Sequence, residues 1–74
     1  MARYFFHVRD GTDKPDTEGT ELPHDQAARS EAVVAMGEAL KDLNGRFWES
    51  REWRMVVTDI TGATVCTLKI SATT

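Results

Sequence analysis

The segment from Trp53 to Ile70 constrains the fold most, because its apolar and polar residues alternate and are interrupted once by a turn sequence. The turn covers residues 59–62, Asp-Ile-Thr-Gly, and its glycine can supply a positive φ. With all four turn residues in the loop, Thr58 pairs with Ala63, and one face of the β-hairpin is almost wholly apolar. That face holds Trp53, Met55, Val57, Cys66, Leu68 and Ile70. A three-residue loop would mix polar and apolar side chains on both faces, so the four-residue loop is predicted.

A hairpin with one apolar face needs a second layer to cover it. The segment from about Asp25 to Leu43 predicts a helix that can do so, since its apolar residues recur at helical spacing. The stripe consists of Ala28, Ala32, Ala35, Met36, Ala39, Leu40 and Leu43. Pro23 is typical of a helix start, and Asn44-Gly45 is typical of a helix end. Asp25 can cap the helix, or its negative charge can interact favourably with the positive N-terminal end of the helix.

The N-terminal residues add a further strand. Residues 3–9 are dense in aromatic and β-branched types and end at the turn signal Asp10-Gly11. The polar segment that follows predicts a loop, with a short edge strand near residues 17–22. The expected fold class is α+β: a small antiparallel β-sheet of three to four strands with one α-helix packed on one face, in the order β-(β)-α-β-β. Residues 1–74 form a single domain, because the chain is too short for two cores.

Composition limits the disulfides, the cellular location and the partners that are expected for the protein. Cys66 is the only cysteine, so no internal disulfide can form. The chain shows no signal peptide and no apolar run long enough to cross a membrane, so a cytoplasmic location and no membrane partner are expected. The net charge is -3 and the nine basic residues are scattered, which argues against a phosphate-backbone partner.

Four separated motifs resemble a known family. They are Arg-Tyr-Phe-Phe-His-Val-Arg-Asp-Gly from residue 3, Asp-Thr-Glu-Gly-Thr-Glu-Leu-Pro from residue 16, Ala-Ala-Arg-Ser-Glu-Ala from residue 27, and Trp-Arg-Met-Val-Val-Thr-Asp-Ile-Thr-Gly from residue 53. Together they resemble a family of short bacterial proteins classed as a domain of unknown function, over nearly the whole chain. The resemblance implies no catalytic residue, cofactor or partner. The chain departs from the pattern at Ile60, where similar proteins tend to place an acidic residue. An exposed isoleucine there is expected to favour local hydrophobic contacts.

No pattern in the chain predicts catalysis or a cofactor. The acidic residues between Asp10 and Glu21 are spaced by three at Asp10, Asp13 and Asp16, so the EF-hand pattern fails and carboxylates that cap backbone amides are expected instead. The soft metal ligands are His7, His24 and Cys66, and nothing in their spacing demands a metal site. The three serines, Ser30, Ser50 and Ser71, are expected in the helix, a charged loop and the tail, and none has the strained or glycine-rich turn typical of a nucleophile. We therefore expect no catalytic residue, no cofactor and no metal.

The aromatic and aliphatic residues outside the expected core are the candidate interface. If Tyr4, Phe6 and Val8 face the helix, then Phe5 joins Val56 and Val65 on the outer surface of the sheet. Phe47 and Trp48 follow the helix. Two interpretations stay open: these residues form an interface, or Phe47 and Trp48 fold back over the core and leave Phe5 as a lone exposed aromatic.

These observations give two hypotheses of different classes. The first is a non-catalytic protein-interaction or regulatory module that self-associates as a homodimer, through a sheet edge or the outer sheet face, and binds another protein. The second is a weak nucleic-acid-binding module that stacks bases on Phe5 and Trp48 with basic residues nearby. The acidic balance of the chain opposes the second hypothesis, so nucleic acid is not the expected partner.

Overall fold

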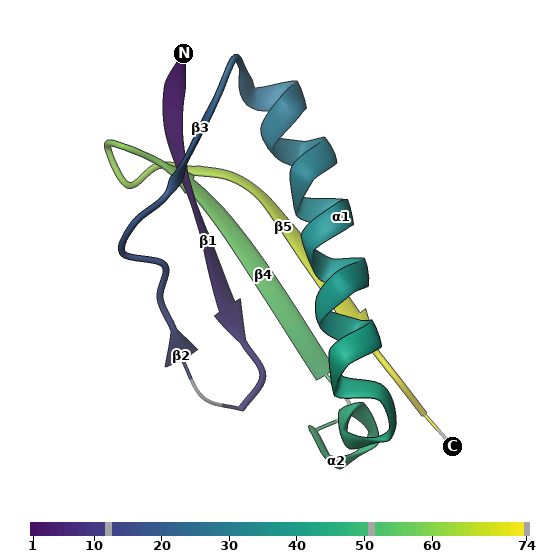
Figure 1. The fold of residues 1–74 in the computed structure, drawn as a ribbon. Helices are drawn as coiled ribbons and strands as arrows, with labels where there is room; N and C mark the ends of the chain where they lie inside the picture. Colours follow the sequence, from purple (N-terminus) through teal and green to yellow (C-terminus); the bar gives the residue numbers. More distant parts are fainter. Residues whose placement is uncertain (12, 51, 74) are drawn as a thin grey trace.

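A five-stranded antiparallel sheet and a long helix across one of its faces form the α+β structure (Figure 1). This computed structural model describes residues 1–11, 13–50 and 52–73. The elements are β1 (Ala2–Arg9), β2 (Asp13–Lys14), β3 (Thr20–Leu22), α1 (Asp25–Leu43), the 3-10 turn η1 (Asn44–Arg46), α2 (Phe47–Ser50), β4 (Glu52–Asp59) and β5 (Thr64–Ser71).

The strands lie in the order β2-β1-β4-β5, and β3 pairs with the same edge of β1 as β2. β3 confirms the short edge strand predicted near residues 17–22. β2 is an additional strand that the alternation could not predict, because two residues are too few to show a period. The sheet therefore has one strand more than the upper limit of the predicted three to four.

Helix α1 has the predicted bounds, but its N-terminal cap is His24 and not Asp25, for which a cap was one of two predicted roles. The imidazole Nδ1 of His24 accepts a hydrogen bond from the backbone N–H of Ala27 at 3.1 Å. Asp25 is the first helical residue, where its charge favours the positive end of the helix. Its carboxylate also accepts a hydrogen bond from the hydroxyl of Tyr4 at 2.7 Å, which ties the start of the helix to β1.

The core lies between α1 and the middle of the sheet. Its buried residues are Tyr4, Ala28, Ala32, Met36, Trp53, Met55 and Val57. The alanines of α1 allow the helix to pack closely on β4 and β5 (Figure 1). The core-facing residues of β5 are less well covered, since Cys66, Leu68 and Ile70 are only half-buried. The predicted apolar face of the hairpin is thus confirmed, with a core centred on β4.

The predicted register of the hairpin is wrong. The backbone N–H of Asp59 donates to the carbonyl of Ala63 at 2.9 Å, so the loop holds three residues, and Thr58 pairs with Thr64 instead of Ala63. A bulge then shifts the pairing, and Val57 lies opposite Cys66. The bulge restores the alternation that a three-residue loop alone would have reversed. The extra residue is Val65, which packs against the core and not on the outer face as expected.

Candidate functional site

The sheet face that points away from α1, here called the outer face, is polar. Residues directly opposite each other on neighbouring antiparallel strands share a face, so the register defines three rows across β1, β4 and β5. The rows are Phe5, Thr58 and Thr64; His7, Val56 and Thr67; and Arg9, Arg54 and Lys69. Only Phe5 and Val56 are apolar among these residues, and both are half-buried. Across these nine described residues, the outer face therefore carries no broad apolar patch.

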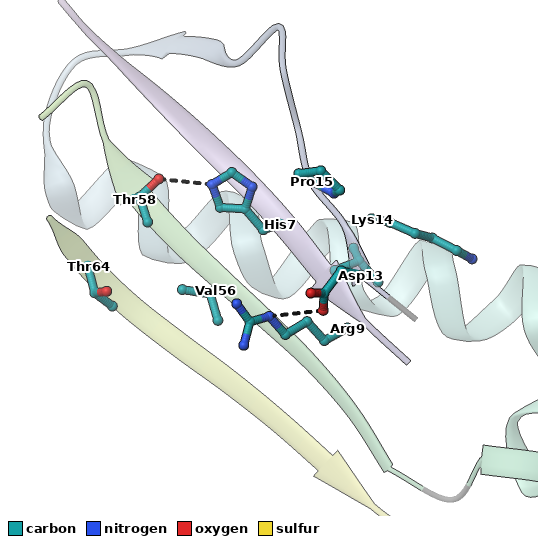
Figure 2. A pocket seen from close by; sticks show the side chains of 9 residues that line it. His7, Arg9, Asp13, Lys14, Pro15, Val56, Thr58 and Thr64 are labelled. Carbon is teal, nitrogen blue, oxygen red and sulfur yellow. Dashed lines mark hydrogen bonds and ion pairs between the residues drawn. The ribbon is translucent and has the colours of Figure 1, made fainter. Parts of the chain in front are cut away.

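His7 lies at the centre of a hydrogen-bonded network on this face. Its Nε2 lies 3.0 Å from Oγ1 of Thr58 on β4 (Figure 2). Its Nδ1 accepts a hydrogen bond from the backbone N–H of Asp16 at 3.0 Å. Its ring stacks on that of Phe5, with centres 6.3 Å apart and planes 11° from parallel. The imidazole thus joins β1, β4 and the segment between β2 and β3.

Asp16 fixes that segment to β1. Its Oδ2 accepts from the backbone N–H of Phe6 at 3.1 Å, and its Oδ1 accepts from the N–H groups of Glu18 and Gly19 at 3.0 Å each. Burial alone raises the pKa of Asp16, but the N–H groups of Gly19, Phe6 and Glu18 outweigh it, so the pKa lies below the ordinary carboxyl value. This confirms that an acidic residue of the predicted loop caps backbone amides.

The hydrogen bonds determine which ring nitrogen of neutral His7 carries the proton. Because Nδ1 accepts from a backbone N–H, it has no proton of its own, and Nε2 is the protonated nitrogen. Nε2 therefore donates to the hydroxyl of Thr58. A base that activates a hydroxyl nucleophile needs the opposite arrangement, in which Nε2 accepts the hydroxyl proton. The His7–Thr58 pair is thus arranged as a structural hydrogen bond.

A shallow groove of about 390 Å³ runs beside His7 (Figure 2). It is lined by His7, Val8, Arg9, Asp13, Lys14, Pro15, Val56, Thr58 and Thr64. Arg9 at one end is held by Asp13, with Nε and Oδ1 3.4 Å apart, and Lys14 is held by Asp10 at 3.2 Å. Sequence reasoning did not find this groove, because it forms only where the segment around Pro15 folds back beside β1.

The row of cations across the sheet is also compensated by carboxylates. Arg54 and Lys69 both lie near Glu52, at 3.5 Å and 3.7 Å. Each basic residue of the row thus has an acidic neighbour, since Arg9 has Asp13. These exposed ion pairs reduce the positive field that the outer face can present.

The five residues predicted as an interface do not gather in one place. Phe5 and Val56 share the outer face on neighbouring strands. Val65 and Phe47 pack against the core. Trp48 is 49% exposed and contacts Phe47 edge-on, with ring centres 6.4 Å apart, at the C-terminal end of α1.

The most open surface of the sheet is the outer edge of β5. In the described residues, β5 is eight residues long, is the last strand of the sheet and pairs only with β4. The opposite edge of the sheet is covered by the short strands β2 and β3. Strand β2 ends at Lys14 and is followed by Pro15, and both residue types are typical protections of an edge. β5 carries one charged residue, Lys69. Sequence reasoning named a sheet edge as a candidate but did not say which.

The flank of α1 beside β5 carries an exposed apolar residue. Helix α1 packs on β5; burial raises the pKa of the Cys66 thiol in that strand, and the charge of Arg29 lowers it in part. Val33 lies one turn further along the same flank and is 61% exposed. Gly37 follows one turn later and has open space beside it. Arg29, Val33 and Gly37 follow one another at four-residue spacing along one side of α1, which we call its β5-side flank, and this flank is partly apolar.

The soft metal ligands do not converge. His7 lies on the outer face, Cys66 on the core side of β5, and His24 caps α1. No group of three or more histidine, cysteine or acidic residues in the described chain is placed to hold a metal ion. Within residues 1–11, 13–50 and 52–73, no helix is long and apolar enough to cross a membrane.

The fold and these surfaces define a small α+β domain with an open sheet edge and a polar outer face. The chain belongs to the family described as Domain of unknown function (DUF6894), whose model matches residues 3–71. A search of curated proteins and a search of solved structures found no match.

Proposed function

We propose that this domain is a non-catalytic protein-interaction module that self-associates through the outer edge of β5. The observation that carries the proposal is the edge strand β5, whose outward N–H and C=O groups have no strand partner in the described residues and whose regular part covers six residues after the bulge at Val65. An edge of this length is a template for a further antiparallel strand. A second copy supplies an identical strand, and an antiparallel pair of identical strands forms a closed two-fold dimer.

The position of α1 supports the same arrangement. The helix packs on both β4 and β5. With its axis midway between these strands, it lies about half a strand spacing inside β5. When two β5 strands pair at about 4.8 Å, the two helices on the same face lie about two spacings apart, or roughly 10 Å. This matches the roughly 8–10 Å that separates packed helices. The β5-side flanks of the two helices then meet, and Val33 is withdrawn from water.

The small core makes such pairing favourable. Cys66, Leu68 and Ile70 face the helix but stay half-buried at the edge of the sheet. A second β5 strand places apolar neighbours beside them and adds to the apolar area removed from water, which stabilises by about 25 cal/mol per Å². Association thus extends the core that a chain of 74 residues can build alone.

Nucleic-acid binding is the second candidate, and the row formed by Arg9, Arg54 and Lys69 favours it. Two observations oppose it. Each cation of the row has a carboxylate within 3.7 Å. The ring of Phe5 stacks on His7 and lies against the backbone of Gly19, which leaves little of its face for a base. Salt-sensitive binding of mixed oligonucleotides, lost on Arg54→Gln, would favour this candidate over a purely protein-binding role.

The test compares two neighbouring valines on α1. Sedimentation velocity over a concentration series gives the dimer dissociation constant of the wild type, Val33→Glu and Val34→Glu. Both valines are exposed, at 61% and 52%, and they point about 100° apart around the helix. We expect Val33→Glu to weaken the dimer at least tenfold, because it places two carboxylates at the helix pair, and Val34→Glu to leave it nearly unchanged.

Circular dichroism of each variant confirms that the fold is retained. A wild-type protein that stays monomeric at millimolar concentration contradicts the proposal. A dimer that is lost on Phe5→Ser but kept in Val33→Glu places the interface on the outer face and contradicts the role of β5.

A further inference from the structure

We propose that the two β5 strands pair with Leu68 on the two-fold axis, so that Thr67 lies opposite Lys69 of the partner subunit. This inference rests on the proposed self-association and adds its register. The register decides which side chains meet across the interface, and it follows from symmetry, the position of the bulge and charge.

Symmetry limits the choice of register first. In an antiparallel pair, directly opposed residues lie on the same face of the sheet. Both helices therefore lie on one side of the joined sheet only when the two-fold axis passes between one residue and its own copy. The residue on the axis then faces its own copy. The register is therefore defined by naming one residue between Thr64 and Ser71.

The bulge and Lys69 select among these residues. Because Val65 is the extra residue of the bulge, the regular part of β5 runs from Cys66 to Ser71. An axis at Thr67 would draw the bulged Val65 into the pairing. An axis at Lys69 would place two ammonium groups directly opposite each other, which is unfavourable. An axis at Leu68 uses residues 66–70 of both copies and avoids both problems.

The direction of α1 agrees with this register. Helix α1 and β5 run in the same direction (Figure 1), and the charge of Arg29 acts on the Cys66 thiol. Val33 lies one turn after Arg29, so it lies further along in the direction of Leu68. An axis at Leu68 therefore brings the β5-side flanks of the two helices, with Val33, toward each other.

This register gives each face of the joined strands a distinct set of contacts. On the core side, Leu68 lies opposite the partner's Leu68, and Cys66 lies opposite the partner's Ile70. On the outer side, Thr67 lies opposite the partner's Lys69. Since the pairing is symmetric, each unlike pair occurs twice, and one substitution changes two contacts.

Charges at position 67 test the register. Thr67 is exposed, so Thr67→Lys and Thr67→Glu both fit the monomer. Thr67→Lys places a second ammonium beside the partner's Lys69 and should raise the dimer dissociation constant about tenfold, whereas Thr67→Glu should lower it by a similar factor. Adding Lys69→Glu should reverse both effects. Equal responses to the two charges would overturn the register.

A disulfide tests the core-side pair. We expect Ile70→Cys to form a dimer-linking disulfide with the partner's Cys66 under mild oxidation with diamide, detected on a non-reducing gel. Positions 66 and 70 of one strand lie about 13 Å apart, too far for a bond within the chain. The control is Cys66→Ser combined with Ile70→Cys, which keeps one cysteine at position 70 and should stay unlinked.

The two proposals fail in different ways. A wild-type dimer by sedimentation, with no charge response at position 67 and no linkage of Cys66 to position 70, overturns the register and leaves the self-association standing. A wild type that is monomeric at every concentration overturns both. Circular dichroism of Ile70→Cys shows whether a missing disulfide results from unfolding. If it does, the change in the dimer dissociation constant on Thr67→Lys and Thr67→Glu decides whether the register stands.

Discussion

The backbone N–H of Asp16 lies 3.0 Å from Nδ1 of His7, while the carboxylate of the same residue accepts the backbone N–H of Phe6 at 3.1 Å. Asp16 therefore contacts two consecutive residues of β1 through two different groups. This double attachment holds the segment between β2 and β3 against the outer face and forms one wall of the groove. The outer face is thus rigidly organised, which favours a structural role for His7.

Removing the Asp16 carboxylate should destabilise the fold. Asp16→Ala leaves the N–H groups of Phe6, Glu18 and Gly19 without their acceptor. We expect a loss of about 2 kcal/mol of unfolding free energy in urea, the usual scale for hydrogen bonds to a charged group. Asp13→Ala is the matched control, since it removes only an exposed ion pair with Arg9 and should cost about 0–1 kcal/mol. Equal losses in the two variants would contradict this role of Asp16.

The same carboxylate makes stability depend on acid. The folded pKa of Asp16 lies below its ordinary value, so its contribution is complete above about pH 4, near the pKa of an unfolded Asp, and is lost as the pH falls through the folded pKa. The unfolding free energy of the wild type, followed by urea denaturation from pH 7 to pH 2, should therefore drop below pH 4. Asp16→Asn should show a shallower drop, and a slope identical to the wild type would refute the assignment.

The tautomer of His7 can be observed directly. Because Nδ1 accepts from Asp16 and Nε2 donates to Thr58, a long-range proton–nitrogen spectrum at pH 8 should show the proton of neutral His7 on Nε2. Thr58→Val removes the acceptor for Nε2 but keeps the interaction at Nδ1, so the tautomer should persist. A proton on Nδ1 in the wild type would mean that the hydrogen bond with the backbone of Asp16 does not form.

Gly19 should tolerate no side chain. Its φ is +77°, and an added Cβ would lie 2.8 Å from Cγ of Arg3, 2.9 Å from Cε1 of Phe5 and 3.0 Å from the carbonyl oxygen of Tyr4. Gly19→Ala should therefore lower the unfolding free energy by more than about 1 kcal/mol. Gly45→Ala, where a Cβ meets nothing within 4 Å, should be neutral or stabilise by up to about 1 kcal/mol. Thermal unfolding measures the stability of both variants. A Gly19→Ala variant as stable as the wild type would contradict the close approach of β1 to Gly19.

Periodic elements could be predicted from the sequence, and irregular ones could not. The stripe of α1 and the apolar face of the hairpin extend over many residues, so their periods were clear and both are confirmed. The hairpin register could not be predicted, because a three-residue loop and a bulge at Val65 cancel each other's effect on which residues face the core. Sequence alternation fixes the face of a strand but not which residue lies opposite.

The network around His7 was only partly predictable. Carboxylates capping amides were expected in the acidic loop, and the Asp-Thr-Glu-Gly stretch from residue 16 is the signal that could have selected Asp16. Its contact with His7 depends on how the loop folds back on β1, which no local pattern encodes. His24 was missed as the cap of α1 because histidine is not among the favoured capping residues.

Hydrogen exchange tests most directly whether the edge of β5 pairs with a second copy. Backbone amides are followed at two protein concentrations, one tenfold below and one tenfold above the dimer dissociation constant. We expect the amides of residues 66–70 that point away from β4 to exchange more slowly at the higher concentration, while the amide of Ile60, a residue that is 74% exposed in the hairpin loop, is unchanged. Exchange in β5 that is the same at both concentrations would show that the edge of β5 does not pair with a second copy.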